Sequence, residues 1–381
     1  VKKTVLFPND NIGLHPDEVT IADMLKTAGY ATACIGKWHL GHQKPFLPTN
    51  QGFDSYYGIP YSNDMTHPGE TRIKKGFERL DEGWTNQVEM TMEWGAPLME
   101  NEEVIEVPVD QRTITRRYTD KAIEFITANQ NKPFFLYLPH SMPHIPLFVP
   151  DDAHDPNPKN AYKATIEHID AETGRLLDTV RELALEENTY VIFTSDNGPW
   201  LRFKHHGGSA LPLNGGKGWC REGGIRVPCV MWGPGRIPAG TRTGDMASTI
   251  DLLPTLAALA GIQPVTRGPI DGLDISDVMM GKGPTPRTEL LYYSGKKNKD
   301  KTFSSCLNGM RMGDWKIVGH HPNKNPALYN LSEDLGEKKN LAAERPDKVA
   351  ELQARMQELD KQLSKEIRTF GKITEKLENN K

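Results

Sequence analysis

Residues 191–198 read Val191-Ile192-Phe193-Thr194-Ser195-Asp196-Asn197-Gly198, and this stretch decides the fold. Its four apolar or β-branched residues predict a buried strand that Gly198-Pro199 ends. Asp196 and Asn197 then stand just beyond the carboxyl end of the strand, where open α/β sheets bind ligands. Their oxygens suit Ca²⁺, or Mg²⁺, better than a softer metal. An Asx turn that only closes the strand explains the same residues, so other segments must decide.

The composition is that of an ordinary soluble enzyme. The 381 residues suffice for two or three domains, or for one large domain with an appendage. A net charge of -4 argues against a nucleic-acid or anionic-membrane partner, and no apolar run approaches the roughly 20 residues of a membrane span. The four cysteines form no CxxC pair, which argues against a zinc knuckle and leaves one or two disulfides open.

Strand and helix patterns alternate over most of the chain. Expected strands cover residues 30–35, 134–138, 191–194 and 225–232, and expected helices cover residues 20–28, 113–129, 161–186 and 251–260. This alternation predicts an α/β fold with a doubly wound, mostly parallel sheet. We expect residues 42–112 to be long loops over the sheet edge that select the substrate, with Ser62-Asn63-Asp64 and His67 as candidate contacts.

The pattern changes after about residue 285. Short alternating segments predict antiparallel strands, and residues 344–367 carry apolar positions at helical spacing. Such a helix forms either a short coiled-coil seam or, more commonly, a face that packs on the domain's own sheet. We therefore expect a catalytic α/β domain over residues 1–285 and a smaller C-terminal α+β subdomain, an antiparallel sheet plus helix, over residues 286–381.

Basic side chains follow several of the expected strands. They are Lys37 and His39 in a glycine-flanked turn, His144 in a proline-rich turn, and Lys217 in a glycine-rich loop after Asp196 and Asn197. In a parallel sheet these strand ends share one edge. Two lysines, two histidines and a hard-metal ligand pair suit a dianionic tetrahedral ester, either sulfate or phosphate. A histidine there can protonate the leaving oxygen or activate a nucleophile. Taken singly, each basic residue is equally explained as a solvated surface side chain.

Several of these motifs resemble those of the sulfatase family. Residues 29–41, Gly-Tyr-Ala-Thr-Ala-Cys-Ile-Gly-Lys-Trp-His-Leu-Gly, resemble its second signature. Residues 194–198, 216–226, 139–146 and 329–341 resemble four further blocks, and Gly58-Ile59-Pro60-Tyr61-Ser62 resembles the arylsulfatase A and N-acetylgalactosamine-6-sulfatase branch. The resemblance implies an alkaline phosphatase-like fold and hydrolysis of sulfate esters, possible substrates being sulfated carbohydrates.

The resemblance also implies roles for individual residues. Lys37, His39, His144 and Lys217 would bind the sulfate and assist its transfer, and Asp196 and Asn197 would ligate Ca²⁺. The family's nucleophile is a formylglycine hydrate made from Cys or Ser in C/S-x-P-S-R, and a base, expected to be a histidine, then expels sulfate. Family habit implies export to a periplasmic, extracellular or lysosomal compartment. It implies neither a nucleic-acid partner nor a particular oligomeric state.

The chain departs from the family pattern at one point. No C/S-x-P-S-R occurs, and no paired aspartates precede Lys37. Because Val1 follows neither an initiator Met nor a signal-type segment, we expect a processed or trimmed product, with the formylglycine motif upstream of residue 1. The 381 residues alone are then expected to be inactive and to bind Ca²⁺ weakly, since Ca²⁺ takes about 6 to 8 oxygens.

Two other functions fit the same residues. One is a phosphatase or phosphonate hydrolase of the alkaline phosphatase superfamily, for which a Ser or Thr nucleophile outside the P-S-R context would be evidence. The other is a non-catalytic relative that binds sulfated glycans through the basic pocket, for which glycan binding without turnover would be evidence.

Overall fold

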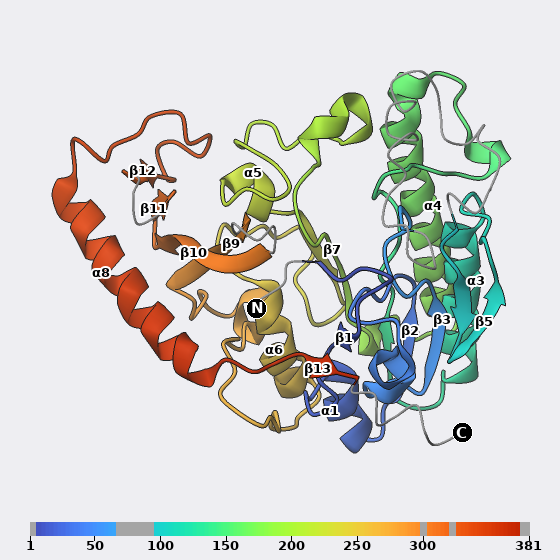
Figure 1. Ribbon diagram of the computed structural model, residues 1–381. Coiled ribbons are helices and arrows are strands. Elements are labelled where there is room, and N and C mark those ends of the chain that lie inside the picture. Colours follow the sequence, from blue (N-terminus) through green and yellow to red (C-terminus); the bar gives the residue numbers. More distant parts are fainter. Residues whose placement is uncertain (1–4, 66–94, 298–302, 320–324, 374–381) are drawn as a thin grey trace. The chain divides into compact units, whose positions relative to one another are not determined.

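The computed structural model describes residues 5–65, 95–297, 303–319 and 325–373 (Figure 1). The chain forms two compact units. The N-terminal unit comprises Leu6–Thr189, Leu253–Ile270 and Phe370–Lys381, and the C-terminal unit comprises Val1–Val5, Tyr190–Leu252 and Asp271–Thr369. The domain boundary expected near residue 285 stays a prediction. Within the described residues, no helix has both the length and the apolar character that a membrane crossing requires.

A mixed five-stranded sheet forms the centre of the N-terminal unit, with strand order β5-β4-β3-β2-β6. Its strands are β2 (Ala31–Ile35), β3 (Ser55–Gly58), β4 (Leu98–Glu100), β5 (Glu103–Glu106) and β6 (Phe134–Tyr137). β2 pairs in parallel with both β3 and β6, whereas β4 and β5 add antiparallel strands beyond β3. The parallel pairing of β2 with β6 agrees with the parallel sheet expected for these two strands, and β3 is a parallel neighbour that was not expected.

Part of the expectation for residues 42–112 is wrong. Their described portion includes β3, β4 and β5 rather than loops alone. β4 and β5 are only three and four residues long, too short to show a clear alternation, and their pairing with β3 supplies the order that local pattern did not reveal. Residues 66–94, and His67 with them, lie outside the described residues.

The helices of the N-terminal unit begin and end close to the positions their sequences predict. They are α1 (Ile21–Thr27), α3 (Ile114–Ala128), α4 (Ala161–Glu182) and α6 (Leu252–Leu259). Thr20 caps α1 in a capping box with Asp23, which satisfies backbone N–H groups that the first turn leaves unpaired. α3 packs along α4 and against β2 and β3 (Figure 1). A short pair, β1 (Ile12–Gly13) and β13 (Gly371–Lys372), joins distant segments of this unit.

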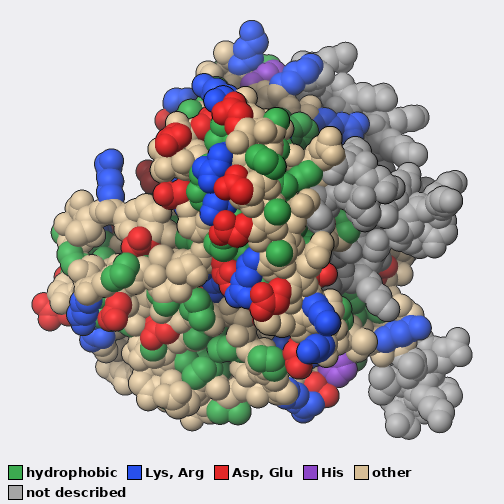
Figure 2. Space-filling model, turned by 90° about the vertical axis from the view of Figure 1, so that its left-hand side faces the viewer, with side chains coloured by type: hydrophobic (Ala, Val, Ile, Leu, Met, Phe, Trp, Pro, Cys, Tyr) green, Lys and Arg blue, Asp and Glu red, His purple; other side chains and the backbone are tan. Residues whose placement is uncertain are grey.

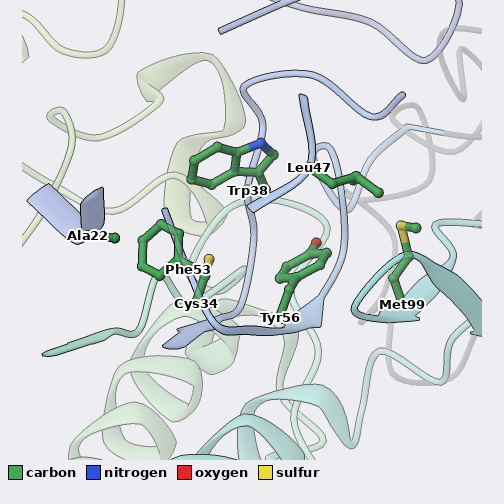
Figure 3. Packing of buried hydrophobic residues seen from close by; sticks show 7 residues of the cluster. All are labelled: Ala22, Cys34, Trp38, Leu47, Phe53, Tyr56 and Met99. Carbon is green, nitrogen blue, oxygen red and sulfur yellow. The ribbon is translucent and has the colours of Figure 1, made fainter. Parts of the chain in front are cut away.

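Large apolar side chains bury the sheet of the N-terminal unit. Figure 3 shows one cluster, in which Trp38 and Phe53 meet edge to face beside Cys34 and Tyr56. The Trp38 indole Nε1 donates a hydrogen bond to the Phe46 carbonyl at 2.7 Å, so its one polar atom is satisfied in the core. This packing fixes the backbone on either side of Trp38, which is the turn that carries Lys37 and His39.

The C-terminal unit contains two antiparallel sheets. β7 (Val191–Thr194) pairs with β8 (Cys229–Trp232), and β9 (Glu289–Lys297), β10 (Phe303–Met312), β11 (Trp315–Val318) and β12 (Ala327–Asn330) form the second sheet in the order β12-β11-β10-β9. β7 was expected to have parallel neighbours, but it pairs with β8 in antiparallel orientation. The expectation that this strand is buried is wrong for Phe193, which is 43% exposed. The reason is that a two-stranded ribbon does not cover both faces of its strands.

α8 (Pro346–Leu363, red in Figure 1) covers the four-stranded sheet. Leu352 and Met356 are fully buried against Met310, Ile317 and Leu328, so the helix packs on its own sheet rather than forming a coiled-coil seam. Its outer face carries ion pairs between neighbouring turns, such as Lys348–Glu351. Figure 2 views the side that carries α8 and shows basic and acidic side chains interleaved there. The smaller helices of the unit are α5 (Glu222–Ile225) and α7 (Ser276–Met279).

Candidate active site

The turn after β2 lies between the ends of its two parallel neighbours. The Gly36 N–H donates to the Tyr57 carbonyl at 2.8 Å on the β3 side, and the Lys37 N–H donates to the Pro139 carbonyl at 2.7 Å on the β6 side. A side chain at Gly36 would place its Cβ 2.1 Å from the Pro139 oxygen, so only glycine permits this approach. Lys37 is thereby held at the shared edge of the three strands, half-buried.

His39 adopts a backbone conformation that is uncommon for a residue with a side chain. Its φ is 61°, its N–H donates to the Pro60 carbonyl at 3.1 Å, and its Nε2 lies 3.0 Å from the Leu6 carbonyl. Because a carbonyl oxygen only accepts, Nε2 carries the proton of this hydrogen bond. Strained backbone of this kind is kept where the surrounding structure demands it, and it often marks a functional turn.

The proline-rich turn after β6 presents His144. Its Nδ1 lies 2.6 Å from the Ile145 carbonyl, so Nδ1 carries the proton and Nε2 has the lone pair of the neutral ring. The Ser62 hydroxyl lies 3.5 Å from the same Nδ1. The segment after β3, which sequence reasoning named as a candidate substrate contact, therefore lies against His144 at the strand exits.

An amide pair that sequence reasoning did not identify holds this turn. The Asn63 Nδ2 donates to Gln111 Oε1 at 3.0 Å and to the Pro146 carbonyl at 3.1 Å, and Gln111 Nε2 donates back to the Asn63 carbonyl at 2.9 Å. Both side chains are buried. Ser62-Asn63-Asp64 was recognisable as a polar cluster, but no local signal connects it with Gln111, 48 residues away.

His140, the other histidine of the proline-rich turn, is half-buried, with its Nδ1 atom shielded from solvent. Burial lowers its pKa to about 4; the carboxylate of Glu172 opposes this shift and the ring of His168 adds to it. A ring that stays neutral in this way is a structural group rather than a proton donor to a substrate. Only His144 of the pair remains a candidate for chemistry.

The second group of candidate residues lies in the C-terminal unit, around the end of β7. The Asn197 Nδ2 donates to Asp196 Oδ1 at 2.6 Å, and the Ser195 hydroxyl donates to the Asn197 carbonyl at 3.1 Å. The Lys217 N–H donates to the Pro199 carbonyl at 2.8 Å, which places the glycine-rich loop against the same turn. The Lys217 ammonium lies 5.0 Å from the centre of the Trp200 ring, a cation–π distance.

The structure thus gathers the six predicted residues into two groups. Lys37 and His39 lie in the turn after β2, which is hydrogen-bonded to the turn after β6 that carries His144. Asp196 and Asn197 lie in the turn after β7, to which the backbone of Lys217 is hydrogen-bonded. The prediction that all six share one pocket stays a prediction.

Asp196 and Asn197 provide part of a ligand set for a hard divalent cation. The two residues are neighbours in the chain, and their carboxylate and amide oxygens are of the kind that Ca²⁺ and Mg²⁺ prefer, although here the Asn197 Nδ2 faces Asp196 Oδ1. Across residues 5–65, 95–297, 303–319 and 325–373, no three His, Cys, Asp or Glu side chains gather in a metal-binding group. The pair therefore fits such a cation as two ligands of a larger set.

The four cysteines do not form the disulfides that their number left open. Cys34 and Cys220 are buried, Cys306 is half-buried, Cys229 is exposed, and all four are free thiols. Burial raises the pKa of Cys34 well above its usual range, which makes it a poor nucleophile.

Two family patterns match the chain and together include all of these motifs. The sulfatase family pattern matches residues 3–262, and the C-terminal pattern of N-sulphoglucosamine sulphohydrolase matches residues 216–367. Arylsulfatase G of Rattus norvegicus is 32% identical over 364 residues, covering 88% of this chain and 69% of that protein. Arylsulfatase A of Homo sapiens is 33% identical over 405 residues, covering 96% of this chain and 76% of that protein.

A solved structure agrees with these matches. The crystal structure of Ps i-CgsB in complex with k-i-k-neocarrahexaose superposes with a TM-score of 0.75 at 26% identity, covering 94% of this chain and 77% of that one. Together with the mixed sheet, its helices and the separate C-terminal antiparallel sheet, this establishes an alkaline phosphatase-like α/β fold. The chain belongs to the sulfatase family of sulfuric ester hydrolases, in the branch of the arylsulfatases and N-acetylgalactosamine-6-sulfatase.

Proposed function

We propose that this chain recognises sulfate monoesters of sulfated carbohydrates and contributes the groups that bind, orient and protonate them. The observation that carries the proposal is the parallel pairing of β2 with β6, which brings Lys37 and His144 to one edge of the sheet. The relatives support the substrate class, since one solved relative is a complex with a neocarrahexaose.

Each basic residue has a distinct part in this proposal. Lys37 and Lys217 donate ammonium hydrogen bonds to the sulfate oxygens, and His39 adds a further donor when its ring is protonated. With one proton kept on Nδ1, Nε2 is the ring atom of His144 that gains and loses the exchangeable proton. Protonated there, His144 donates to the ester oxygen as it leaves, which avoids expelling an alkoxide.

In the sulfatase family, a formylglycine and a metal ion complete the chemistry. The formylglycine of sulfatases supplies the nucleophile. Sulfatase relatives are metalloenzymes, and we propose Ca²⁺ as the metal, held in part by Asp196 and Asn197. When bound, the cation supplies positive charge to an equatorial sulfate oxygen. We further propose, from the family, an exported location, to be checked by fractionation of the source cells.

Binding of galactose 6-sulfate by the 381-residue chain, followed by titration calorimetry, tests the recognition step. We expect inorganic sulfate to compete and unmodified galactose not to bind. Lys37→Ala and Lys217→Ala should each weaken binding about tenfold, the loss of one hydrogen bond to a charged group. Lys44→Ala is the matched control, because Lys44 is a surface lysine paired with Glu102. Equal binding of galactose, or tighter binding of galactose 6-phosphate than of the sulfate, would contradict the assignment.

Calcium titration tests the metal pair separately. Asp196→Ala should weaken Ca²⁺ binding by about tenfold or more, since one carboxylate is removed from a small ligand set. Asp277→Ala, an exposed carboxylate on α7 of the same unit, serves as the control. Unchanged Ca²⁺ affinity in Asp196→Ala would remove this residue from the metal site.

A further inference from the structure

A lysine is completely buried on β11 between two glutamates. The Lys316 Nζ lies 2.7 Å from Glu222 Oε1 and 3.1 Å from Glu337 Oε1, and it faces the Tyr292 ring at 5.1 Å. The contact with Glu222 is an aligned hydrogen bond, whereas the contact with Glu337 is an ion pair without that alignment. The three side chains, here called the buried triad, are at most 2% exposed.

Burial of three charged groups costs free energy, and the need to fill space in the core does not explain why they are there. Each ion loses hydration worth several kcal/mol, and an apolar group of similar volume often stabilises a fold equally well. The residues around the buried triad are already an apolar cluster of Cys220, Tyr292, Val318, Tyr329 and Leu331. Buried ionic groups are best attested as devices that select one arrangement of the backbone.

The backbone selected here is that of the glycine-rich loop. Glu337 Oε2 accepts the Glu222 N–H at 2.7 Å, and the next residue, Gly223, donates to the Asn214 carbonyl at 2.7 Å. A Cβ at Gly223 would lie 2.4 Å from the Gly215 carbonyl oxygen, so the two ends of the loop touch along their backbones. The buried triad thus closes the loop whose interior carries Lys217.

The same contacts reach the turn after β7. The Gly224 carbonyl accepts the Gly198 N–H at 3.0 Å, one residue beyond Asn197, and the Pro199 carbonyl accepts the Lys217 N–H at 2.8 Å. Hydrogen bonds joined by short stretches of backbone therefore link Lys316, on the C-terminal sheet, to Gly198, the residue after the candidate metal pair, and to the Lys217 backbone.

We propose that the buried triad is a positioning device, by which the C-terminal sheet sets the backbone of the Lys217 loop and of the Asp196–Asn197 turn for sulfate binding. Lys316, Glu222 and Glu337 act through Lys217 and touch no substrate themselves. The sulfate part of this inference rests on the proposed function, whereas the control of backbone order stands on the contacts above.

The test compares two triad variants with a surface control. Glu222→Gln keeps the side-chain volume and leaves Lys316 paired with Glu337, so it is expected to fold, and Lys316→Met removes the shared cation. Lys339→Met breaks the exposed ion pair with Glu344 in the same unit. Two quantities are measured on the 381-residue chain: hydrogen exchange at the amides of residues 198, 217 and 223, and the dissociation constant for inorganic sulfate.

In both triad variants we expect hydrogen exchange at the three amides to rise about tenfold or more relative to amides of α8. The reason is that local opening of the loop costs less free energy when it no longer has to break the ionic contacts of the triad. Sulfate binding should weaken about fivefold or more with it. Lys339→Met should change neither quantity. If Lys316→Met does not fold, Glu222→Gln decides.

A lower unfolding midpoint with unchanged exchange at these amides would show that the triad only stabilises the fold and would overturn the proposal. Faster exchange with unchanged sulfate affinity would overturn its link to sulfate. If the wild-type chain binds no sulfate, the role of Lys217 fails, and hydrogen exchange still decides whether the triad orders the loop.

Discussion

Replacing Asn63 by alanine should disturb both the stability of the N-terminal unit and the turn that carries His144. Asn63 is fully buried, and its Nδ2 serves two buried acceptors, Gln111 Oε1 and the Pro146 carbonyl. Asn63→Ala removes the donor of each. A buried acceptor that loses its partner costs about 1–3 kcal/mol, so two such losses predict about 2–5 kcal/mol after partial relaxation.

Asn50→Ala is the matched control for this change. The Asn50 Nδ2 also makes two hydrogen bonds, to the Lys44 carbonyl and to Glu102 Oε1, both at 2.8 Å, but both are exposed. Water replaces them, so we expect a loss below about 1 kcal/mol.

Native-state hydrogen exchange in urea, read at the slowest amides of β2 and β6, measures the free energy of opening of this unit for each variant. The reasoning also predicts faster exchange at the His144 amide, which donates to the Ser141 carbonyl at 3.3 Å. Equal losses for Asn63→Ala and Asn50→Ala, or an unchanged His144 amide, would refute the view that the buried amide pair holds the turn.

Three further predictions concern other features. His140 has a pKa of about 4 in the fold against about 6.5 in the unfolded chain. It therefore does not destabilise the fold above pH 6.5, whereas the free energy of unfolding drops by up to about 3 kcal/mol as the pH falls from 6.5 to 4. His140→Gln should flatten this part of the stability–pH curve. Gly58→Ala would put a Cβ 1.8 Å from a backbone oxygen and should cost about 3 kcal/mol or more in urea unfolding, whereas Gly174→Ala, with open space on α4, should stabilise by about 0.5–1 kcal/mol. A thiol reagent should label exposed Cys229 in the native protein and buried Cys34 only after unfolding; a disulfide found by mass spectrometry would contradict the four free thiols.

Local sequence patterns anticipated the elements whose determinants lie within a few residues. Thr20 as a capping residue predicts the start of α1, and the segment 30–35 predicts β2, because capping and periodicity act over one or two turns. The glycines around Lys37 likewise predicted a tight turn, and the structure places Gly36 of this turn directly against the Pro139 backbone. The sulfatase motifs are of this local kind, which explains why they were recognisable without a structure.

Pairing between distant segments escaped the same patterns. β7 looked like a strand of a parallel sheet, and only its register with β8 showed an antiparallel pair. The short strands β4 and β5 carry too few residues for an alternation to show. In each case the deciding contacts join residues far apart in sequence, and no local periodicity records which partner a strand will meet.

The sequence alone predicted which residues carry the chemistry, namely Lys37, His39, His144, Asp196, Asn197 and Lys217. It did so because short-range spacing puts them beside strand ends or glycine turns. Only the tertiary structure decided what holds them. Asn63 and Gln111 are 48 residues apart, and Lys316 and Glu222 are 94 residues apart. Such pairs form because burial forces polar groups to find partners wherever the chain brings one, and that requirement arises only once the fold has excluded water.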